Sequence, residues 1–467
     1  MQQLTHLDAV FLSMETRETP SHIGGLALLD PTSSPAAFGF QRFVDFLESR
    51  VALCPRFSWR IQEVPLGLDR PYWIESDDTR PRDQVHRVNA PAPGGTRELA
   101  DLAGLLFERP LDRSRPLWEI FYIEGLQGGR VALLWKVHHC LMDGASGAGL
   151  AELLFDLSPE PAERPLIPVD DTARAGRPAS LGEMFGQAVR NGLGLPFASA
   201  RHIGRAVRGT LENLFEEDAS DASAIAPRAS FNSTVGARRA VAWSTVPLED
   251  AKAIKNTLGV KLNDVVLAIT GGAIRRYLEE RGELPAQSLV AAVPISMRDQ
   301  GDKSLGNNLS EINVYWGTDR EDPVERVYAI HEAANRAKHE VKMRRSVDPM
   351  GILAETLVPG AVNLLMRAVS SATDSIPLPA NAVVSNVPMT PIPVYIAGAK
   401  VEGVVPISLL APTQGLNITV ISYDGALHFG ITADPDQLRE PWAIAGAIQK
   451  AMIDLQQSVA GEEALGG

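Results

Sequence analysis

Residues 131–147, VALLWKVHHCLMDGASG, combine a strand pattern with a pair of histidines at its end. The apolar run 131–137 is typical of a buried strand. Asp143 and Gly144 follow where a tight turn is expected, and the next residues begin a helical pattern that Ser146 can cap. A strand that passes through a tight turn into a helix predicts one unit of an α/β layered domain.

The residues before this stretch show the same alternation of strand and helix. Residues 23–29, IGGLALL, predict another buried strand. Residues 40–53 and 98–111 carry apolar side chains at helical spacing, and Pro110 stops the second of these helices. This order of elements favours an α/β domain in the first part of the chain.

The second half of the chain has a similar layout. The predicted elements are helices at 264–280 and 324–342, a strand at 288–296 and a final helix at 441–457. Two alternating runs flank Asp424-Gly425, which is the strongest hairpin signal in the chain. We therefore expect a second α/β domain, related to the first by a pseudo-twofold axis, with a cleft between the two.

A segment rich in proline, alanine and serine separates the halves, from about residue 160 to 240. It predicts an N-terminal domain over 1–165, a linker over 166–235 and a C-terminal domain over 236–467. Within the linker, residues 181–215 are amphipathic and locally basic in an acidic protein. This segment fits either a helix on a lipid surface or a crossover helix packed on the protein itself.

Composition narrows the class of protein. The chain has 467 residues, of which 45% are hydrophobic, enough for two domains. A formal net charge of -13 disfavours nucleic acid as a partner, because phosphate binding needs a basic face. Cys54 and Cys140 are too few for a disulfide scaffold and fit a reducing cytoplasm. The sequence has neither a signal peptide nor an apolar run of about 18 residues, so any membrane contact should be peripheral.

The histidine pair can carry out proton transfer. Consecutive residues that leave a strand point to opposite sides, so one histidine can face a cavity and its neighbour the scaffold. A neutral, oriented histidine can take a proton from an alcohol at neutral pH, and we expect His139 to be that base. Asp143 would hold the loop through an ion pair with Arg298, which follows a strand end in the other half.

Three other kinds of chemistry use parts of the same string. A metal ion could bind His139 and Asp143, but no third or fourth ligand is evident, so no metal is expected. The sequence GASGAG at 144–149 is not the GxSxG of a serine hydrolase. Cys140 could be a nucleophile, although it lies inside the turn with no separate support.

The string HHCLMDG matches HHxxxDG, the motif shared by CoA-dependent acyltransferases and the condensation domains of peptide synthetases. Further strings accompany it over nearly the full chain: LDAVFLSMET, HIGGLALLD, RPLWEI, LNDVVLA, PISMRD, GNNLS, SNVP and GLNITVISYDG. Together they resemble the bacterial wax ester synthase/diacylglycerol acyltransferase family.

This resemblance implies two chloramphenicol-acetyltransferase-like α/β domains with the active site in a tunnel between them. It implies that acyl-CoA is a substrate, that no cofactor is needed, and that diacylglycerol or a long-chain alcohol is the acceptor. By the same resemblance His139 is the general base, His138 supports the motif, and Asp143 and Gly144 shape the loop. It also implies peripheral attachment to the inner face of the membrane or to lipid droplets.

The resemblance extends to three further motifs. Their residues are Pro116, Leu117 and Trp118 in RPLWEI, Asn263 and Asp264 in LNDVVLA, and Ser385 and Asn386 in SNVP. The first motif would support or line the acyl channel, although a core role fits Trp118 as well. Asn263 would approach the active site, whereas Asp264 could simply favour the positive end of its helix. SNVP is expected to form a turn near the tunnel.

Three functions fit these observations to different extents. Direct acyl transfer from CoA to a hydroxyl group accounts for the whole set of motifs. A condensation-type enzyme that uses carrier-bound acyl groups would share His139 and Asp143, but no carrier domain adjoins in this sequence. A non-catalytic lipid-droplet protein would not need an intact HHxxxDG.

Overall fold

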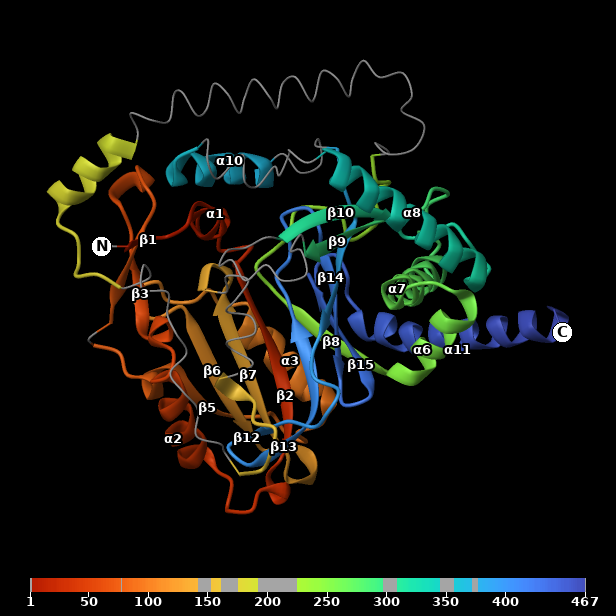
Figure 1. The fold of residues 1–467 in the computed structure, drawn as a ribbon, viewed down its shortest axis with the longest axis horizontal. Coiled ribbons are helices and arrows are strands. Elements are labelled where there is room, and N and C mark those ends of the chain that lie inside the picture. Colours follow the sequence, from red (N-terminus) through yellow and green to blue (C-terminus); the bar gives the residue numbers. More distant parts are fainter. Residues whose placement is uncertain are drawn as a thin grey trace.

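The computed structural model describes residues 2–76, 78–141, 153–160, 175–191, 225–296, 309–344, 357–371 and 377–466. Its described part contains two six-stranded sheets, with helices on their faces, and a smaller three-stranded sheet near the N-terminus (Figure 1). This is the two-part α/β fold that the sequence predicts.

The first sheet has the strand order β12-β13-β2-β7-β6-β5. Its strands are β2 (His22–Asp30), β5 (Val85–Asn89), β6 (Trp118–Glu124), β7 (Val131–His138), β12 (Tyr395–Ile396) and β13 (Ala399–Ile407). Along β7, Leu133 packs in the same cluster as α2 (Phe40–Val51), and Leu134 packs with α3 (Thr96–Phe107). Because both faces are buried, the strand is apolar without alternation.

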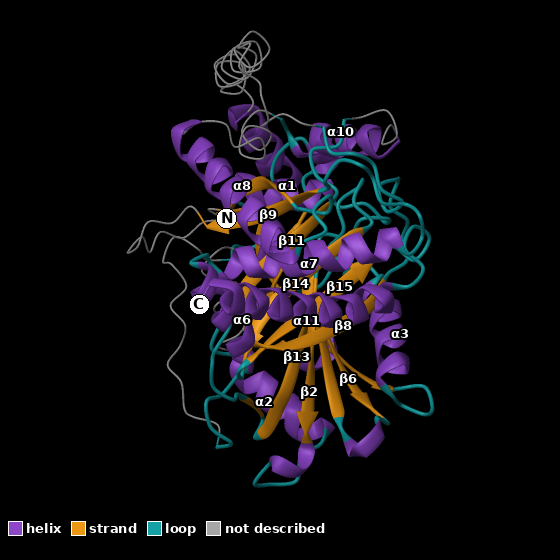
Figure 2. Ribbon diagram, turned by 90° about the vertical axis from the view of Figure 1, so that its right-hand side faces the viewer, coloured by secondary structure: helices purple, strands orange, loops and turns teal. Residues whose placement is uncertain are grey.

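The second sheet has the order β10-β9-β11-β14-β15-β8. Its strands are β8 (Ala240–Pro247), β9 (Val290–Ser296), β10 (Leu309–Tyr315), β11 (Ala382–Pro388), β14 (Leu416–Tyr423) and β15 (Ala426–Ala433). The helices packed with it are α6 (Leu248–Leu258), α7 (Leu262–Glu279), α8 (Pro323–Arg344) and α11 (Pro441–Gly466) (Figure 2). Because α7 packs against α11 and α8, it is apolar on most of its surface.

The second half of the chain contributes a strand to the sheet of the first half. Strand β13, from the second half, pairs antiparallel with β2 of the first half and so extends the first sheet. Where β15 passes β13, a Cβ on Gly430 would lie 1.8 Å from the carbonyl oxygen of Pro406. The junction therefore requires glycine at this position. The proposed domain limits at 165 and 235 stay a prediction.

Two helices and a small sheet cover the end of the molecule where β7 finishes. These elements are β1 (Gln2–Gln3), β3 (Trp59–Gln62), β4 (Tyr72–Glu75), α1 (His6–Met14) and α10 (Pro359–Ser371). Helix α10 lies on α1, with Val362 against Val10, and the Asn363 side chain donates to the Ser13 carbonyl at 3.0 Å (Figure 1).

Most predicted elements are confirmed, but SNVP is not a turn. The hairpin at Asp424-Gly425 joins β14 to β15, with positive φ angles of 44° and 80° at the two residues. The expectation for SNVP was wrong because residues 385–388 complete β11, which pairs in parallel with β14. The β-branched residues Val383 and Val384 favour a strand before SNVP, and Pro388 occupies the last position of that strand.

Two expectations concern lipid contact. Of the amphipathic segment 181–215, residues 181–191 are helical, and the rest lies outside the described residues. Within the described ranges, no single helix is long and apolar enough to cross a membrane. The helices α6 and α7 reach that composition only as a pair, with a bend of 108° between them.

Candidate active site at the end of strand β7

Three sequence motifs meet where β7 ends. Strand β7 lies between β2 and β6, so His138 pairs with His22 and Val137 pairs with Trp118. The backbone N–H of His138 also donates to the Leu117 carbonyl at 2.9 Å. The HIGGLALLD, RPLWEI and HHxxxDG strings are far apart in sequence but adjacent in the sheet.

The side chain of His138 is fully buried, and both of its ring nitrogens lie close to polar groups. Its Nδ1 accepts a hydrogen bond from the N–H of Cys140 at 3.1 Å, so the ring proton of the neutral form lies on Nε2. That nitrogen lies 3.3 Å from Oε2 of Glu15. These contacts indicate that the ring of His138 supports the turn after β7.

Glu15 joins this histidine to two other segments. Its Oε2 accepts the N–H of Ser21 at 2.9 Å, and its Oε1 accepts from Nη2 of Arg113 at 2.9 Å. Burial raises the pKa of Glu15, but the contacts with His138, Arg113 and the Ser21 N–H outweigh burial and lower the pKa to about 2. The carbonyl of Ser21 in turn accepts the N–H of His139 at 2.9 Å. An ionised carboxylate therefore fixes the backbone around the histidine pair.

The other side of the β7 end is tied to the C-terminus of α3. The Nζ of Lys136 donates to the carbonyls of Leu106 and Arg109 at 3.1 and 2.7 Å. The Nε2 of His22 lies 2.6 Å from the Phe107 carbonyl, and burial together with nearby Lys136 lowers the pKa of His22 to about 3. These side chains satisfy carbonyls that the helix end leaves without partners.

His139 is the more accessible histidine of the pair. It begins the short 3-10 turn η6 (His139–Leu141) and is half-buried. Its ring stacks on Phe11 of α1, with centroids 3.9 Å apart and planes 19° apart, and its buried Nδ1 makes no hydrogen bond to another described residue. Burial and the neighbouring His138 lower the pKa of His139 to about 4, against a smaller effect of its own carbonyl. The ring is therefore neutral at pH 7 and can accept a proton.

Cys140 does not compete for this role. Its side chain is fully buried. Burial, assisted by the charge of Asp8, raises the pKa of the thiol well above its usual range. A buried neutral thiol is a poor nucleophile, which favours the imidazole of His139 over Cys140 as the reactive group.

We expect the acidic limb of the kcat/KM profile to lie near pH 4. With the pKa of His139 at about 4, the ring takes up a proton only as the pH falls through that value. Activity should therefore rise through about pH 4 and stay constant towards neutral pH. The profile is measured with acyl-CoA and a soluble alcohol. A limb centred near 6.5, the value of a free histidine, would contradict the buried environment.

Phe11→Ala should lower kcat by up to about tenfold. An aromatic stack is worth about 0.5–1.5 kcal/mol beyond the area it buries, and here it orients the ring of His139. Phe11→Tyr keeps the stack and serves as the control. If Phe11→Ala turned over at the wild-type rate, other contacts would have to orient the ring.

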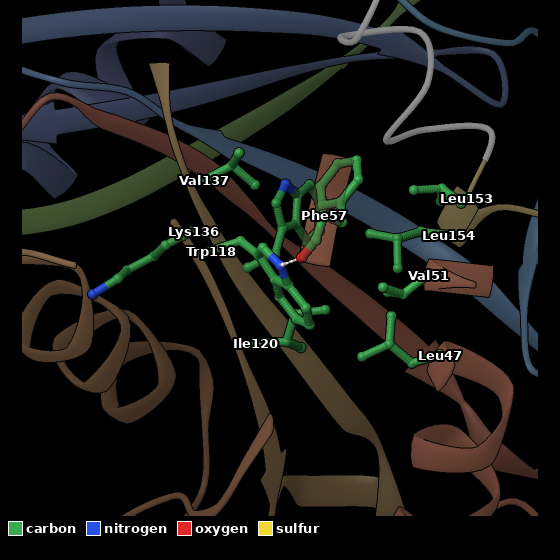
Figure 3. A pocket seen from close by; sticks show the side chains of 10 residues that line it. Leu47, Val51, Phe57, Trp118, Ile120, Lys136, Val137, Leu153 and Leu154 are labelled. Carbon is green, nitrogen blue, oxygen red and sulfur yellow. Dashed lines mark hydrogen bonds between the residues drawn. The ribbon is translucent and has the colours of Figure 1, made fainter. Parts of the chain in front are cut away.

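Trp118 has a core role in this structure. It is 3% exposed, and its Nε1 donates to the carbonyl of Phe57 at 2.6 Å (Figure 3). Its ring borders an apolar cavity with Val137 and Leu154. The cavity measures about 10 Å³, which is room for one water molecule but not for an acyl chain. The channel role of RPLWEI therefore stays a prediction.

The carbonyls of the same motif are held by one buried glutamine. The Nε2 of Gln84 donates to the carbonyls of Pro116 and Trp118, at 2.8 and 2.6 Å. Together with the bond from His138 to Leu117, these contacts hold the start of β6 against the end of β7.

Asn263 and Asp264 lie in the first turn of α7. The Oδ2 of Asp264 accepts the N–H of Lys261 at 2.9 Å and lies 2.6 Å from Nδ1 of His331 on α8. Asp264 thus caps its helix and fastens it to the next one. Asn263 is half-buried beside it.

The remaining predicted site residues are not brought to the histidines by the described structure. Ser385 and Asn386 lie on β11 of the second sheet. Within the described ranges, no hydrogen bond or ring contact joins them, or the LNDVVLA pair, to the histidine pair. Asp143, Gly144 and Arg298 lie outside the described residues.

Comparison with known proteins identifies the family. The model of the wax ester synthase/diacylglycerol acyltransferase catalytic domain matches residues 4–266, and the model of the C-terminal domain matches residues 305–456. The chain belongs to this family. Two proteins of Mycobacterium tuberculosis, both provisionally named diacylglycerol O-acyltransferases, are 33% and 32% identical over 97% of this chain and cover 90% and 98% of their own lengths.

Solved structures agree with this assignment. The wax ester synthase/diacylglycerol acyltransferase of Marinobacter aquaeolei is 27% identical with a TM-score of 0.71, over 98% of this chain and 100% of that one. The first condensation domain of the calcium-dependent antibiotic synthetase shares the fold, with a TM-score of 0.57 at 16% identity over 98% of this chain and 97% of that one. The family and the fold predicted from the motifs are both confirmed, and the chain is an acyltransferase.

Proposed function

We propose that this enzyme transfers the acyl group of acyl-CoA to the hydroxyl of diacylglycerol or of a long-chain alcohol, with His139 as general base. The observation that carries the proposal is a half-buried, neutral imidazole, stacked on Phe11, at the motif of an acyltransferase family. The names of the relatives cover both acceptors. Acyl-CoA acts as a substrate, and the reaction uses no cofactor.

The reaction needs a single histidine. His139 takes the hydroxyl proton while the acceptor oxygen attacks the thioester carbonyl. The tetrahedral intermediate collapses, the carbon–sulfur bond breaks, and the thiolate of CoA takes the proton back from the ring. The low pKa of about 4 makes the imidazolium a strong acid for this last step and leaves the ring neutral for the next cycle. No covalent acyl-enzyme is formed.

The other motif residues position this base or the substrates. The supporting set on the HHxxxDG side is His138, Asp143, Gly144, Pro116, Leu117 and Trp118, and the set contributed by the second half is Asn263, Asp264, Arg298, Ser385 and Asn386. Losing the carbonyl contact of Leu117 or the Glu15 contact of His138 would displace the ring of His139, since both hold the residue before it.

Both acceptors are lipids, so the enzyme works at a lipid surface. We propose that it attaches peripherally to the inner face of the membrane or to lipid droplets. A water-excluding site suits these substrates because it protects the thioester from hydrolysis.

The test uses purified protein, palmitoyl-CoA and either dioleoylglycerol or hexadecanol, with the lipid products separated. We expect triacylglycerol or wax ester to appear in step with free CoA. Absence of ester with both acceptors would contradict the proposal. Ester formation only from an acyl group on a carrier protein would assign the chain to condensation-type chemistry instead.

A further inference from the structure

Six large apolar side chains stand exposed along one border of the molecule, which we call the apolar edge. They are Leu66, Leu181, Phe185, Val189, Leu364 and Leu365. They come from three segments: the short turn η3 (Pro65–Gly67), the helical residues 181–191 and α10. None of them has a part in the site at β7.

The three segments are neighbours in space. On one side of η3, the side chain of Gln62 donates to the Ala179 carbonyl at 2.9 Å and accepts its N–H at 2.7 Å. On the other side, a Cβ on Gly67 would lie 2.6 Å from the backbone nitrogen of Gly360 in α10. Figure 1 shows the helical residues 181–191, in yellow, and α10 along the same upper border. The apolar edge is therefore continuous across η3.

The helical residues 181–191 present a stripe to the outside. Leu181, Phe185 and Val189 recur every four residues, so they lie on one face of the helix. Their exposed fractions are 63%, 45% and 61%. Met184 lies on the other face and packs against Val64. This helix thus has apolar side chains on both sides, although only one side packs on the protein.

Leu66 and α10 follow the same pattern. Leu66 is 87% exposed and has a φ of 58°, a left-handed conformation that is unfavourable for a residue with a side chain. On α10, Val362 packs on α1, whereas Leu364 is 70% exposed. Within the described part of the chain, no contact compensates for a strained backbone that holds a leucine in solvent, which points to an external partner.

The charged side chains around the apolar edge favour a partner with negative charge. Each carboxylate in the described segments 62–70, 175–191 and 357–371 is bound by a side chain. The pairs are Glu63 with Arg113, Asp69 with Asn191, and Glu183 with Arg177. Arg190 and Arg367 form no ion pair with a described residue. In a chain with a net charge of -13, an apolar edge with two arginines that pair with no described carboxylate matches an anionic lipid surface.

We propose that the apolar edge binds the surface of a bilayer or droplet that carries anionic headgroups. The proposal deepens the proposed function, because it also orients the active site. Behind the edge, α10 packs on α1 through Val362 and Val10, and Phe11 of α1 stacks on His139. Docking therefore places the lipid surface on the side of the molecule where α1 covers the base.

Two edge variants test this, each with two substitutions: Phe185→Ser with Val189→Ser, and Leu364→Ser with Leu365→Ser. A matched control removes two leucine-like side chains elsewhere, Leu105→Ser with Ile453→Ser, which are 48% and 50% exposed on α3 and α11. Binding to vesicles of phosphatidylcholine and phosphatidylglycerol is measured by sedimentation. We expect each edge variant to bind at least about tenfold more weakly than wild type, and the control to bind normally.

Activity separates docking from catalysis. Transfer to dioleoylglycerol in vesicles should fall in the edge variants, while transfer to dispersed dihexanoylglycerol should not change. Equal vesicle binding by wild type and both edge variants would overturn the proposal, as would loss of transfer to dihexanoylglycerol. A dimer that the edge variants dissociate, without vesicle binding by wild type, would assign the edge to self-association. Vesicle binding through the edge without ester formation would leave docking standing and refute the proposed function.

Discussion

The substitution His139→Ala is expected to lower kcat for ester formation by about a hundredfold to ten-thousandfold, the usual contribution of a general base. The ring of His139 is half-buried, and its Nδ1 makes no hydrogen bond to another described residue, so its loss should disturb the fold little. The assay compares initial rates with acyl-CoA and either acceptor, and thermal unfolding serves as the control for folding. A variant that keeps the wild-type rate would show that His139 is not the general base of the reaction.

The substitution Glu15→Gln is expected to lower the free energy of unfolding by about 3 kcal/mol. Glu15 has a 6% exposed side chain, bonds to Arg113 and the Ser21 N–H, and lies 3.3 Å from the ring of His138. The amide can replace part of this network but not its charge, so among the described residues Arg113 keeps only the exposed carboxylate of Glu63 as its anion.

The same variant should change how stability depends on pH. The folded-state pKa of Glu15 is about 2, below its usual 4.5, so its contribution is complete above about pH 4.5 and is lost as the pH falls towards 2. Urea unfolding at several pH values should show this loss in wild type and not in Glu15→Gln. The exposed neighbour Glu18→Gln is the control. Identical pH slopes in wild type and Glu15→Gln would contradict the network.

Local patterns predicted most of the fold because helix and strand periods are properties of short segments. The apolar run of β7, the helical spacing of α2 and the Asp424-Gly425 hairpin all appear within a few residues of their predicted positions. The pairing of β13 with β2 was not predictable in this way. It joins residues near 26 to residues near 405, and no short-range signal carries such a contact. The turn expected at SNVP was wrong because proline is common in turns, and the pairing of residues 385–388 with β14 is not visible in the sequence.

For the active site, the motif predicted the base but not its surroundings. His138 and His139 were identified from the sequence because two histidines at a strand end form a recognisable string. Glu15, Arg113 and Phe11 were missed, although two of them lie in the quoted string LDAVFLSMET. Their roles depend on contacts across about a hundred residues, which only the folded chain brings together.

We infer that His139 acts as a base and not as a nucleophile, so that the acyl group passes directly to the acceptor. The most direct test mixes the enzyme with radiolabelled palmitoyl-CoA in the absence of any acceptor and follows both CoA release and label on the protein. If the transfer is direct, no burst of CoA and no labelled protein appear until a hydroxyl acceptor is added. A burst of about one CoA per enzyme, with label on His139 or Cys140, would contradict it.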